Sequence, residues 1–360
     1  MIIIVGAGIA GLSLGWQLAK RGQSVTILER GKIGSGASGA AAAYLEPRLG
    51  TGAMRALEWA SIDAWPAFAA NLEDASGISV DYRQQGQLRL AFKEDVDKLK
   101  ADAEERQNQN WRVDWLDRPQ LIALEPHLSG AVVGGVHLPD LAWVDAQKLC
   151  AALAAAIKAK GGRIEEGVNV QTLSGTAGKI TGVITDQGVI SGGKIVLCTG
   201  AVNLDGAPDD VPRARPVRGV MLTLAMDPSA PLISHLMRSQ DGILCPRADG
   251  ALLVGTTHEE GETSSLVADD IVDRLLQRAA LAVPAVRDLP IRKVTSGLRG
   301  LVGDGLLRLG KSKKMQGLYY SLSHAGAGFL RAPTLSKEFS DFITAPDAAC
   351  PMIDKFLKRA

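Results

Sequence analysis

The sequence has few cysteines, no excess of charge and no long apolar run. Its four cysteines, Cys150, Cys198, Cys245 and Cys350, are far apart and form no CxxC pair, which argues against a disulfide framework or a zinc site. Its 40 basic and 39 acidic side chains give a net charge of +1, so nothing in the charge balance indicates nucleic-acid binding. No stretch reaches the roughly 20 apolar residues that span a bilayer. The sequence therefore predicts a cytoplasmic protein without a bound metal.

The chain begins with the pattern of a βαβ unit. Residues 2–5 are a short β-branched run, and residues 9–20 repeat apolar side chains at helical spacing. Residues 24–28 form a second apolar run that ends at Glu29. A length of 360 residues predicts two domains, the first of them an α/β domain with a parallel sheet.

A glycine motif connects the first predicted strand to the first helix. The hexapeptide Gly6-Ala7-Gly8-Ile9-Ala10-Gly11 fits G-x-G-x-x-G in the strand–turn–helix setting that makes this motif specific. Gly6 permits the tight turn, Gly8 lets the backbone approach a pyrophosphate, and Gly11 allows close helix–strand packing. Glu29, 18 residues after Gly11, is placed to accept the ribose hydroxyls of an adenosine. The motif predicts a dinucleotide site at the amino end of the helix.

The segment that follows favours FAD over NAD. An NAD-binding domain would continue with further βα units, whereas residues 31–49 are rich in Gly, Ala and Ser. Such small residues indicate backbone packed against an extended, flat ligand.

Further along, the pattern predicts two helical stretches around 52–76, a hairpin over 80–92, a helix over 146–160 capped by Asp145, and a closing helix over 328–343. The basic segment Lys355 to Ala360 is expected to be a solvated end. Strands flank inserted material on both sides, so the two domains are expected to be interleaved. The predicted boundaries are 1–78, 141–212 and 296–345 for the FAD-binding domain, 79–140 and 213–295 for the substrate-binding domain, and 346–360 for a C-terminal tail.

With these motifs the chain resembles the D-amino-acid oxidase superfamily of FAD enzymes, and most of all its glycine oxidase group linked to thiamine synthesis. The resemblance covers nearly the whole chain and rests on eight blocks in the right order. Beyond GAGIAG with Glu29, the blocks are GSGASGAAAAYL, GVNV at 167–170, LCTGA at 197–201, PVRG at 216–219, CPR to VGTT over 245–257, GLR at 297–299 with Asp304-Gly305 and Leu309-Gly310, and HAGAG at 324–328 with Ala332-Pro333.

The resemblance implies a fold, an activity and a set of partners. The fold is α/β, with a Rossmann-type FAD-binding domain interleaved with an α+β substrate domain on a mainly antiparallel sheet. The activity is oxidation of a small amine or amino acid, of the glycine, sarcosine or D-amino-acid type, to the imine by hydride transfer to flavin N5. Oxygen would reoxidise a noncovalently bound FAD and give hydrogen peroxide. A homo-oligomer is compatible with this family.

The resemblance also implies site residues. Arg299 is the candidate for the substrate carboxylate, because a guanidinium fork fixes a carboxylate through two hydrogen bonds. Arg299 and His324 are the predicted catalytic pair, and the turn from Gly326 would direct N–H groups at the flavin. The predicted cofactor residues are Gly6, Gly8, Ile9, Ala10, Gly11, Glu29, Arg30, Ala37, Ser38, Ala42, Ala43, Tyr44, Val170, Thr199, Gly200, Arg299, His324, Ala325, Gly326, Ala327, Gly328, Phe329 and Leu330. The predicted substrate residues are Tyr44, Arg218, Met221, Arg247 and Arg299.

Two departures from the family pattern leave the substrate open. Gly300 replaces a proline, and Gly326 stands where glycine oxidases often carry an arginine. Four alternatives for the function also stay open: an amino-acid dehydrogenase that passes electrons to a quinone, flavin oxidation of a modified tRNA base, an NAD-dependent enzyme, and a non-catalytic FAD-binding protein.

Overall fold

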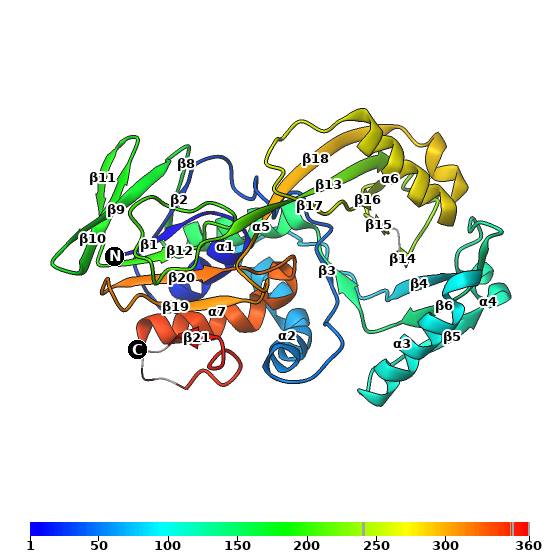
Figure 1. Ribbon diagram of the computed structural model, residues 1–360, viewed down its shortest axis with the longest axis horizontal. Coiled ribbons are helices and arrows are strands. Elements are labelled where there is room, and N and C mark those ends of the chain that lie inside the picture. The colour runs from blue at the N-terminus through cyan, green and yellow to red at the C-terminus, as the bar shows by residue number, and fades with distance from the viewer. Residues whose placement is uncertain (240–241, 346, 348, 359–360) are drawn as a thin grey trace.

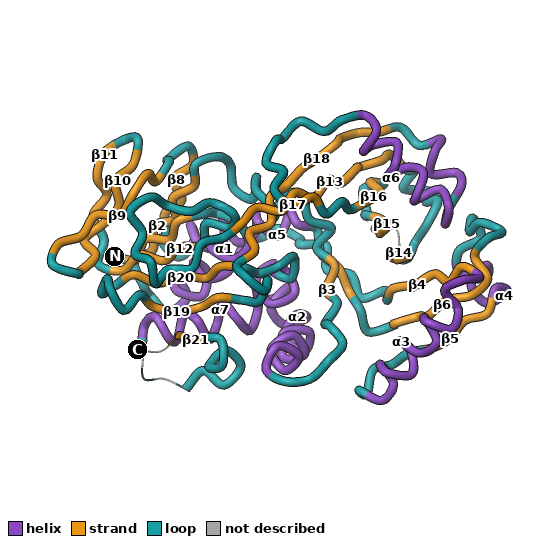
Figure 2. Tube along the Cα trace, in the orientation of Figure 1, coloured by secondary structure: helices purple, strands orange, loops and turns teal. Residues whose placement is uncertain are grey.

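The chain folds into two lobes that share two long strands (Figures 1 and 2). The computed structural model describes residues 1–239, 242–345, 347 and 349–358. One lobe is built on a seven-stranded sheet and the other on a nine-stranded sheet. The strands β13 (Arg215–Ala225) and β18 (Ile291–Leu301) pair antiparallel along their length and run from one lobe into the other.

The seven-stranded sheet carries the predicted βαβ unit at its centre. Its order is β21-β19-β20-β12-β1-β2-β8, and β1 pairs in parallel with both β2 and β12. All four residues of β1 are buried, which explains why the strand is apolar throughout. The strands are β1 (Ile2–Val5), β2 (Val25–Glu29), β8 (Arg163–Glu166), β12 (Lys194–Leu197), β19 (Arg308–Lys311), β20 (Leu318–Leu322) and β21 (Leu357–Lys358).

Helices cover one face of this sheet and a small antiparallel sheet covers the other (Figure 1). The helices are α1 (Ile9–Lys20), α2 (Ala53–Ser76), α5 (Ala146–Ala159) and α7 (Gly328–Thr344), and they pack on one another around Trp16 and Trp65. The small sheet consists of β9 (Val170–Thr176), β10 (Lys179–Thr185) and β11 (Gly188–Ser191). Asp145 caps α5 by accepting a hydrogen bond from Lys148 N at 2.8 Å, as predicted.

The nine-stranded sheet is antiparallel except where β14 pairs with β4. Its strands are β4 (Gln87–Phe92), β5 (Asp114–Asp117), β6 (Val132–Leu138), β13, β14 (Leu236–Ser239), β15 (Gly242–Pro246), β16 (Ala251–Gly255), β17 (Glu259–Glu260) and β18. The helices of this lobe are α3 (Val96–Asn108), α4 (Arg118–Leu124) and α6 (Asp269–Ala282). Two short strands, β3 (Tyr44–Leu45) and β7 (Ala142–Trp143), pair between the lobes. The predicted fold class is confirmed.

Three local predictions were wrong: two helices around 52–76, a hairpin over 80–92, and a solvated C-terminal end. Residues 53–76 form one helix with Pro66 inside, because both halves bury the same face against α5 and α7. Residues 80–86 do not pair with β4 as a hairpin. They run beside β7 instead, with Arg83 bridged to Trp143.

The end of the chain is packed rather than solvated. Cys350 and Ile353 are fully buried, and Leu357–Lys358 joins the sheet edge beside β19. Pro346, Ala348, Arg359 and Ala360 lie outside the described residues. The domain boundaries stay a proposal. In its support, strands of the seven-stranded sheet come from residues 2–29, 163–197 and 308–322, whereas those of the nine-stranded sheet come from 87–138 and 215–301. Residues 357–358 of the predicted tail also join the seven-stranded sheet.

Candidate active site

The glycine turn after β1 leaves no room for side chains at two positions. Gly6 has a φ of +107°, and a Cβ there would lie 2.5 Å from the carbonyl oxygen of Cys198. A Cβ on Gly11 would clash with the carbonyl oxygen of Gly6. Gly6 therefore makes the turn and Gly11 lets α1 pack against it, as the motif predicts.

The amino end of α1 is open to an anion. Ser38 Oγ accepts a hydrogen bond from Ile9 N at 2.9 Å, and the carbonyl oxygen of Gly8 accepts one from Leu12 N at 2.9 Å. The first N–H groups of a helix have no intrahelical partner, so those of Ala10 and Gly11 remain for a ligand. Apart from its chain neighbours, the one described atom within 4 Å of a Cβ on Gly8 would be Ser38 Oγ, at 3.1 Å. The backbone at Gly8 can thus be approached closely.

Glu29 stands beside this turn at the end of β2. Its carboxylate accepts hydrogen bonds from Ala7 N at 2.8 Å and from Gly31 N at 2.9 Å. Each oxygen keeps a second lone pair, so the carboxylate can still accept ribose hydroxyls. The backbone of Val168 donates to the carbonyl of Glu29 at 3.0 Å, which brings the segment 167–170 to the same place.

Other predicted cofactor residues lie in the protein interior or in loops. Ala42 and Ala43 are buried in two different apolar clusters, and Val170, the first residue of β9, is buried between the small sheet and the seven-stranded sheet. Arg30 is exposed, and Thr199 bonds to the carbonyl of Val202 at 2.6 Å.

The turn before α7 lies next to the amino end of α1. Ala325 and Gly326 have positive φ angles of 49° and 82°, which shape the turn into the helix. A Cβ on Gly328 would lie 3.1 Å from Ile9 Cγ2, so the amino ends of α1 and α7 are neighbours. Phe329 and Leu330 are buried in the core, so the turn can offer a ligand only their backbone. Two helix ends with partial positive charge therefore converge here.

His324 begins this turn. Its Nε2 lies 3.2 Å from Ser321 Oγ, while its buried Nδ1 has no partner within the described part of the chain. Burial of the ring, and then the charge of Arg331, lower the pKa of His324 to about 4. The imidazole is therefore neutral at pH 7, and its Nδ1 is available to a bound group.

A buried ion pair that the sequence did not reveal holds the turn in place. Arg331 Nε donates to Glu58 Oε1 at 3.0 Å, and both side chains are at most 1% exposed. Arg331 Nη1 also donates to the carbonyl of His324 at 3.1 Å, and Arg48 Nη2 donates to that of Ala325 at 3.4 Å. No local pattern marks Glu58, because one charged residue in a helix looks like a solvated one.

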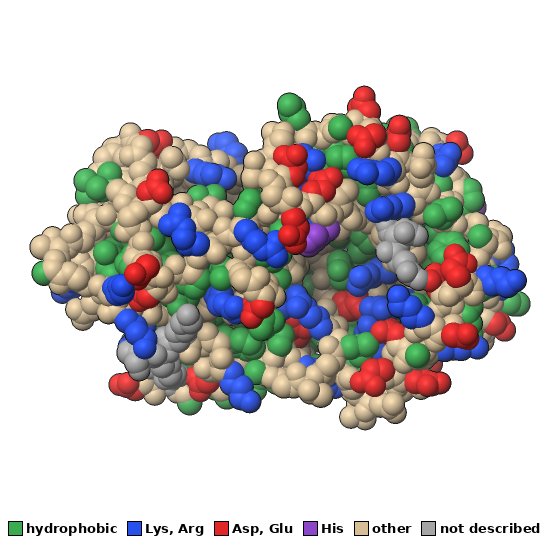
Figure 3. Space-filling model, in the orientation of Figure 1, with side chains coloured by type: hydrophobic (Ala, Val, Ile, Leu, Met, Phe, Trp, Pro, Cys, Tyr) green, Lys and Arg blue, Asp and Glu red, His purple; other side chains and the backbone are tan. Residues whose placement is uncertain are grey.

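Arg299 lies on β18 where the two lobes meet. Its guanidinium covers Gly219, where any Cβ would lie within 2.7 Å of it, and donates to Thr257 O at 3.2 Å and Thr256 Oγ1 at 3.0 Å. Among the described residues no carboxylate forms an ion pair with it. Burial lowers the pKa of Arg299, and nearby Tyr44 partly offsets this. Figure 3 shows the molecule hollowed near its middle, with basic side chains around the hollow.

The structure brings two further substrate candidates to this place and leaves two out. Met221 lies on the same face of β13 as Gly219, and Tyr44 is close enough to act on the charge of Arg299. Arg218 points to the opposite face and binds Glu259 Oε2 at 2.5 Å. Arg247 is buried and donates to the carbonyls of Ala42 and Val144, so it supports the loop before Tyr44.

The small-residue loop packs directly on β18. A Cβ on Gly297 would lie 2.7 Å from Ala40 Cβ and 3.1 Å from Ala37 Cα. A Cβ on Gly300 would clash with the carbonyl of Gly200. This contact explains why glycine, and not the family's proline, follows Arg299 in this chain.

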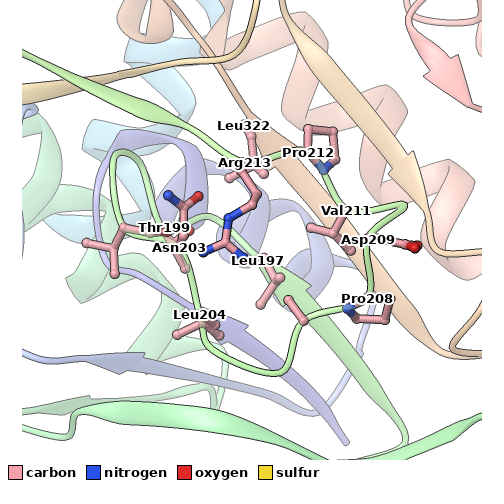
Figure 4. Close-up of a pocket in the computed structure, with 12 residues that line it drawn as sticks. Leu197, Thr199, Asn203, Leu204, Pro208, Asp209, Val211, Pro212, Arg213 and Leu322 are labelled. Atoms are coloured by element: carbon pink, nitrogen blue, oxygen red, sulfur yellow. Dashed lines mark hydrogen bonds between the residues drawn. The ribbon is translucent and has the colours of Figure 1, made fainter.

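A separate cavity of about 200 Å³ lies beyond the end of β12 (Figure 4). Leu197, Thr199, Asn203 and Arg213 are among its lining residues. Asn203 is already bonded on both sides of its amide to the backbone of Ala214, at 2.8 Å each. The cavity brings together no group of the predicted catalytic pair.

These features define a class of protein. The open end of α1, the bare backbone at Gly8 and the carboxylate of Glu29 fit a dinucleotide, and the free Nδ1 of His324 with the α7 turn fits a second, flat part of it. Within the described residues, no cluster of His, Cys, Asp and Glu could hold a metal ion. None of the helices described combines the length and apolar character needed to cross a bilayer. The fold and site are those of a flavin-dependent oxidoreductase.

Comparisons with known proteins agree with this class. The chain belongs to the DAO family of FAD-dependent oxidoreductases, whose family model matches residues 1–342. It is 30% identical to the bifunctional protein ThiO/ThiG of Trichormus variabilis over 347 aligned residues. The aligned region covers 95% of this chain and 52% of that protein. It is 29% identical to a glycine oxidase of Geobacillus kaustophilus, over 97% of this chain and 94% of the relative.

A solved glycine oxidase structure from Bacillus cereus superposes with a TM-score of 0.92 at 25% identity, covering 100% of this chain and 98% of the other. The chain spans about half the length of the bifunctional relatives that it matches. FAD dependence, predicted from the sequence, is thereby confirmed.

Proposed function

We propose that this chain oxidises a small amine or amino acid to the imine, with molecular oxygen as the electron acceptor and hydrogen peroxide as the second product. The relatives named glycine oxidase support the reaction type. Bound FAD supplies the two-electron acceptor, which takes a hydride from the substrate carbon next to nitrogen. The chain itself must bind the substrate, orient it and exclude water.

The observation that carries this proposal is the unpaired guanidinium of Arg299. It is half-buried between the lobes, and its partners among the described residues are neutral oxygens of Thr256 and Thr257. A partly buried cation without an anion loses part of its hydration, and a substrate carboxylate would offset that loss. The bidentate pair would also fix the α-carbon in one orientation. We infer that Arg299 binds the substrate carboxylate.

The remaining residues give the substrate its surroundings. Met221 belongs to an apolar cluster with Ile243, Leu236 and Trp143, against which Tyr44 packs. These side chains provide an apolar floor beside Arg299 and keep water from it. His324 is neutral at pH 7 by its lowered pKa, so we assign it hydrogen bonding at the cofactor rather than proton abstraction. An amine that binds uncharged needs no strong protein base.

Substitution of Arg299 tests this proposal. Arg299→Ala should lower kcat/KM for an amino-acid substrate by about 2–5 kcal/mol, the usual loss when one partner of a buried charge pair is removed. Arg292→Ala, an exposed arginine on the same strand, is the matched control and should leave turnover unchanged. Unchanged kcat/KM in Arg299→Ala would reject the role.

An anaerobic screen tests the reaction itself. Glycine, sarcosine, D-amino acids and proline are added to the purified holoenzyme, and bleaching of the flavin absorbance is followed. Reoxidation with oxygen should then yield one hydrogen peroxide per imine. Electron transfer to a dye or quinone without peroxide would instead identify a dehydrogenase. If no amine bleaches the flavin, the proposed function is wrong. The cytoplasmic location stays a prediction.

A further inference from the structure

A second arginine shares the sheet face that carries Arg299. The strand register pairs Arg238 on β14 with Ile243, Ile243 with Gly255, and Gly255 with Met221. Directly paired residues lie on the same face, so the side chains of Arg238, Ile243 and Met221 form one row across four strands, and Gly255 leaves room for Met221 within it. The sequence analysis missed β14, because Leu236–Ser239 is too short to show an alternating pattern.

Arg299 lies on that same face, a short distance along the sheet. It pairs with Val217, which is four residues before Met221 on β13 and so points the same way. Its guanidinium covers Gly219, two residues from Met221. The two arginines therefore flank an apolar floor made by Ile243 and Met221.

The separation of the two arginines suits a short ligand. Three strand spacings and two residues along β13 put the Cα of Arg238 about 16 Å from the guanidinium of Arg299 above Gly219. A ligand whose two carboxylates lie about 5 Å apart needs two guanidinium carbons about 13 Å apart, because each carboxylate lies about 4 Å from its guanidinium carbon. The guanidinium carbon of Arg238 must therefore lie about 3 Å nearer to Arg299 than its Cα does, which is within the length of an arginine side chain.

Tyr44 connects the two arginines electrostatically. The guanidinium of Arg238 lies 5.3 Å from the centre of the Tyr44 ring, and Tyr44 also acts on the charge of Arg299. Tyr44 is therefore in ring contact with Arg238 and close enough to Arg299 to affect its pKa.

Among the described residues, the charges of the ion-pair cluster that contains Arg238 do not cancel. Glu46 binds three arginines, Arg89, Arg106 and Arg238, and Asp102 binds two of these, Arg89 and Arg106. Three positive and two negative charges leave an excess of one positive charge. The cluster can therefore accept one more anion.

Arg238 is the member of this cluster that a ligand can reach. Its side chain is 36% exposed, against 18% for Arg89 and 3% for Arg106. Glu46 Oε2 holds its Nη1 at 2.6 Å. In the described part of the chain, the other edge of this guanidinium makes no hydrogen bond.

We propose that Arg238 is a specificity-determining residue that binds a second carboxylate, so that the substrates are amines with two carboxylate groups, such as acidic D-amino acids. Arg299 takes the carboxylate next to the reacting carbon, and Arg238 takes the distal one over the floor of Ile243 and Met221. This inference rests on the proposed function for its reaction, but it concerns which ligand the pocket prefers.

Turnover measurements test the preference. Wild-type holoenzyme should show a kcat/KM at least tenfold higher for D-aspartate or D-glutamate than for D-alanine or glycine. Arg238→Ala should lower the value for the acidic substrates by about 30- to 1,000-fold, mainly through KM, and leave that for glycine within about threefold. Arg238→Lys, which keeps the charge beside Glu46, covers the case in which Arg238→Ala does not fold. Arg292→Ala is the control and should change neither ratio.

A binding measurement separates this inference from the proposed function. Succinate and acetate are titrated into the holoenzyme, and the shift of the flavin spectrum gives Kd without turnover. Wild type should bind succinate at least tenfold more tightly. Arg238→Ala should lose that difference, and Arg238→Lys should reduce it, because its ammonium pairs with Glu46 and lacks the second edge of the guanidinium. Equal affinities in wild type, or an unchanged difference in both variants, would overturn the inference even if amines bleach the flavin. If no amine bleaches the flavin but the difference depends on Arg238, the inference on the ligand stands and the proposed reaction fails.

Discussion

The buried pair of Glu58 and Arg331 should be the most sensitive charged contact in the chain. Glu58 is 0% exposed and Arg331 is 1% exposed, and they connect α2 to α7. Glu58→Gln keeps the shape of the side chain but removes the charge. In the variant, the guanidinium of Arg331 is buried without an anion. The backbone N–H of Arg48, which donates to Glu58 Oε2 at 2.8 Å in the wild type, would face an amide N–H₂ instead of an acceptor.

Removal of one partner from a buried pair costs about 3–5 kcal/mol. We therefore expect Glu58→Gln to lower the free energy of unfolding by that amount, measured by urea titration of the holoenzyme with tryptophan fluorescence and flavin release as probes. The double variant Glu58→Gln/Arg331→Met should be less destabilised than the sum of the two single variants, because it removes both charges.

Asp341→Asn provides the matched control. Asp341 pairs with Arg21 at 2.7 Å and likewise connects two core helices, α7 and α1, but the side chains are 35% and 26% exposed. An exposed pair of this kind contributes at most about 1 kcal/mol. If Glu58→Gln destabilised the protein no more than Asp341→Asn, burial would not be what makes the first pair important.

Two further predictions concern the flavin side of the site. The pKa of His324 is lowered from 6.5 to about 4, so the unfolded chain binds more protons than the folded chain between these pH values. The contribution of His324 to the free energy of unfolding should therefore be complete above pH 6.5 and fall by up to about 3 kcal/mol as the pH drops to 4. His324→Asn should flatten that part of the pH profile in urea titrations. Gly11→Ala should lower the free energy of unfolding by at least about 1–3 kcal/mol and lose most of its FAD, because the new methyl group clashes with the carbonyl of Gly6. Gly193→Ala, with open space around the new methyl group, should keep both its stability and its FAD. A yellow, stable Gly11→Ala protein would contradict the packing argument.

The local chemistry of the nucleotide site could be predicted from the sequence. Strand 2–5, helix 9–20 and Glu29 follow one another within 30 residues, and Glu29 accepts a hydrogen bond from Ala7 N inside this unit. The spacing of the glycines and of Glu29 is therefore visible in a single short segment, because Gly11 must approach Gly6 closely where strand and helix meet. The resemblance then extended the prediction to FAD and to Arg299.

The substrate side could not be predicted in the same way. Arg218 and Arg247 looked equivalent to Arg299 in sequence, yet one points to the other sheet face and the other is bonded to backbone carbonyls. Arg238 carried no signal, and Glu58 and Arg331 are 273 residues apart. Similarly, Pro66 suggested two helices where shared packing against α5 and α7 keeps one.

The sequence by itself determined that a strand, a glycine turn and a helix bind a dinucleotide, because the glycines and Glu29 that mark this site lie within one short segment. Tertiary structure alone decided which arginines share a sheet face and which of them already has an anion. Those properties depend on strand register and burial, which bring together residues that are distant along the chain and fix the charge that each one is left to bind.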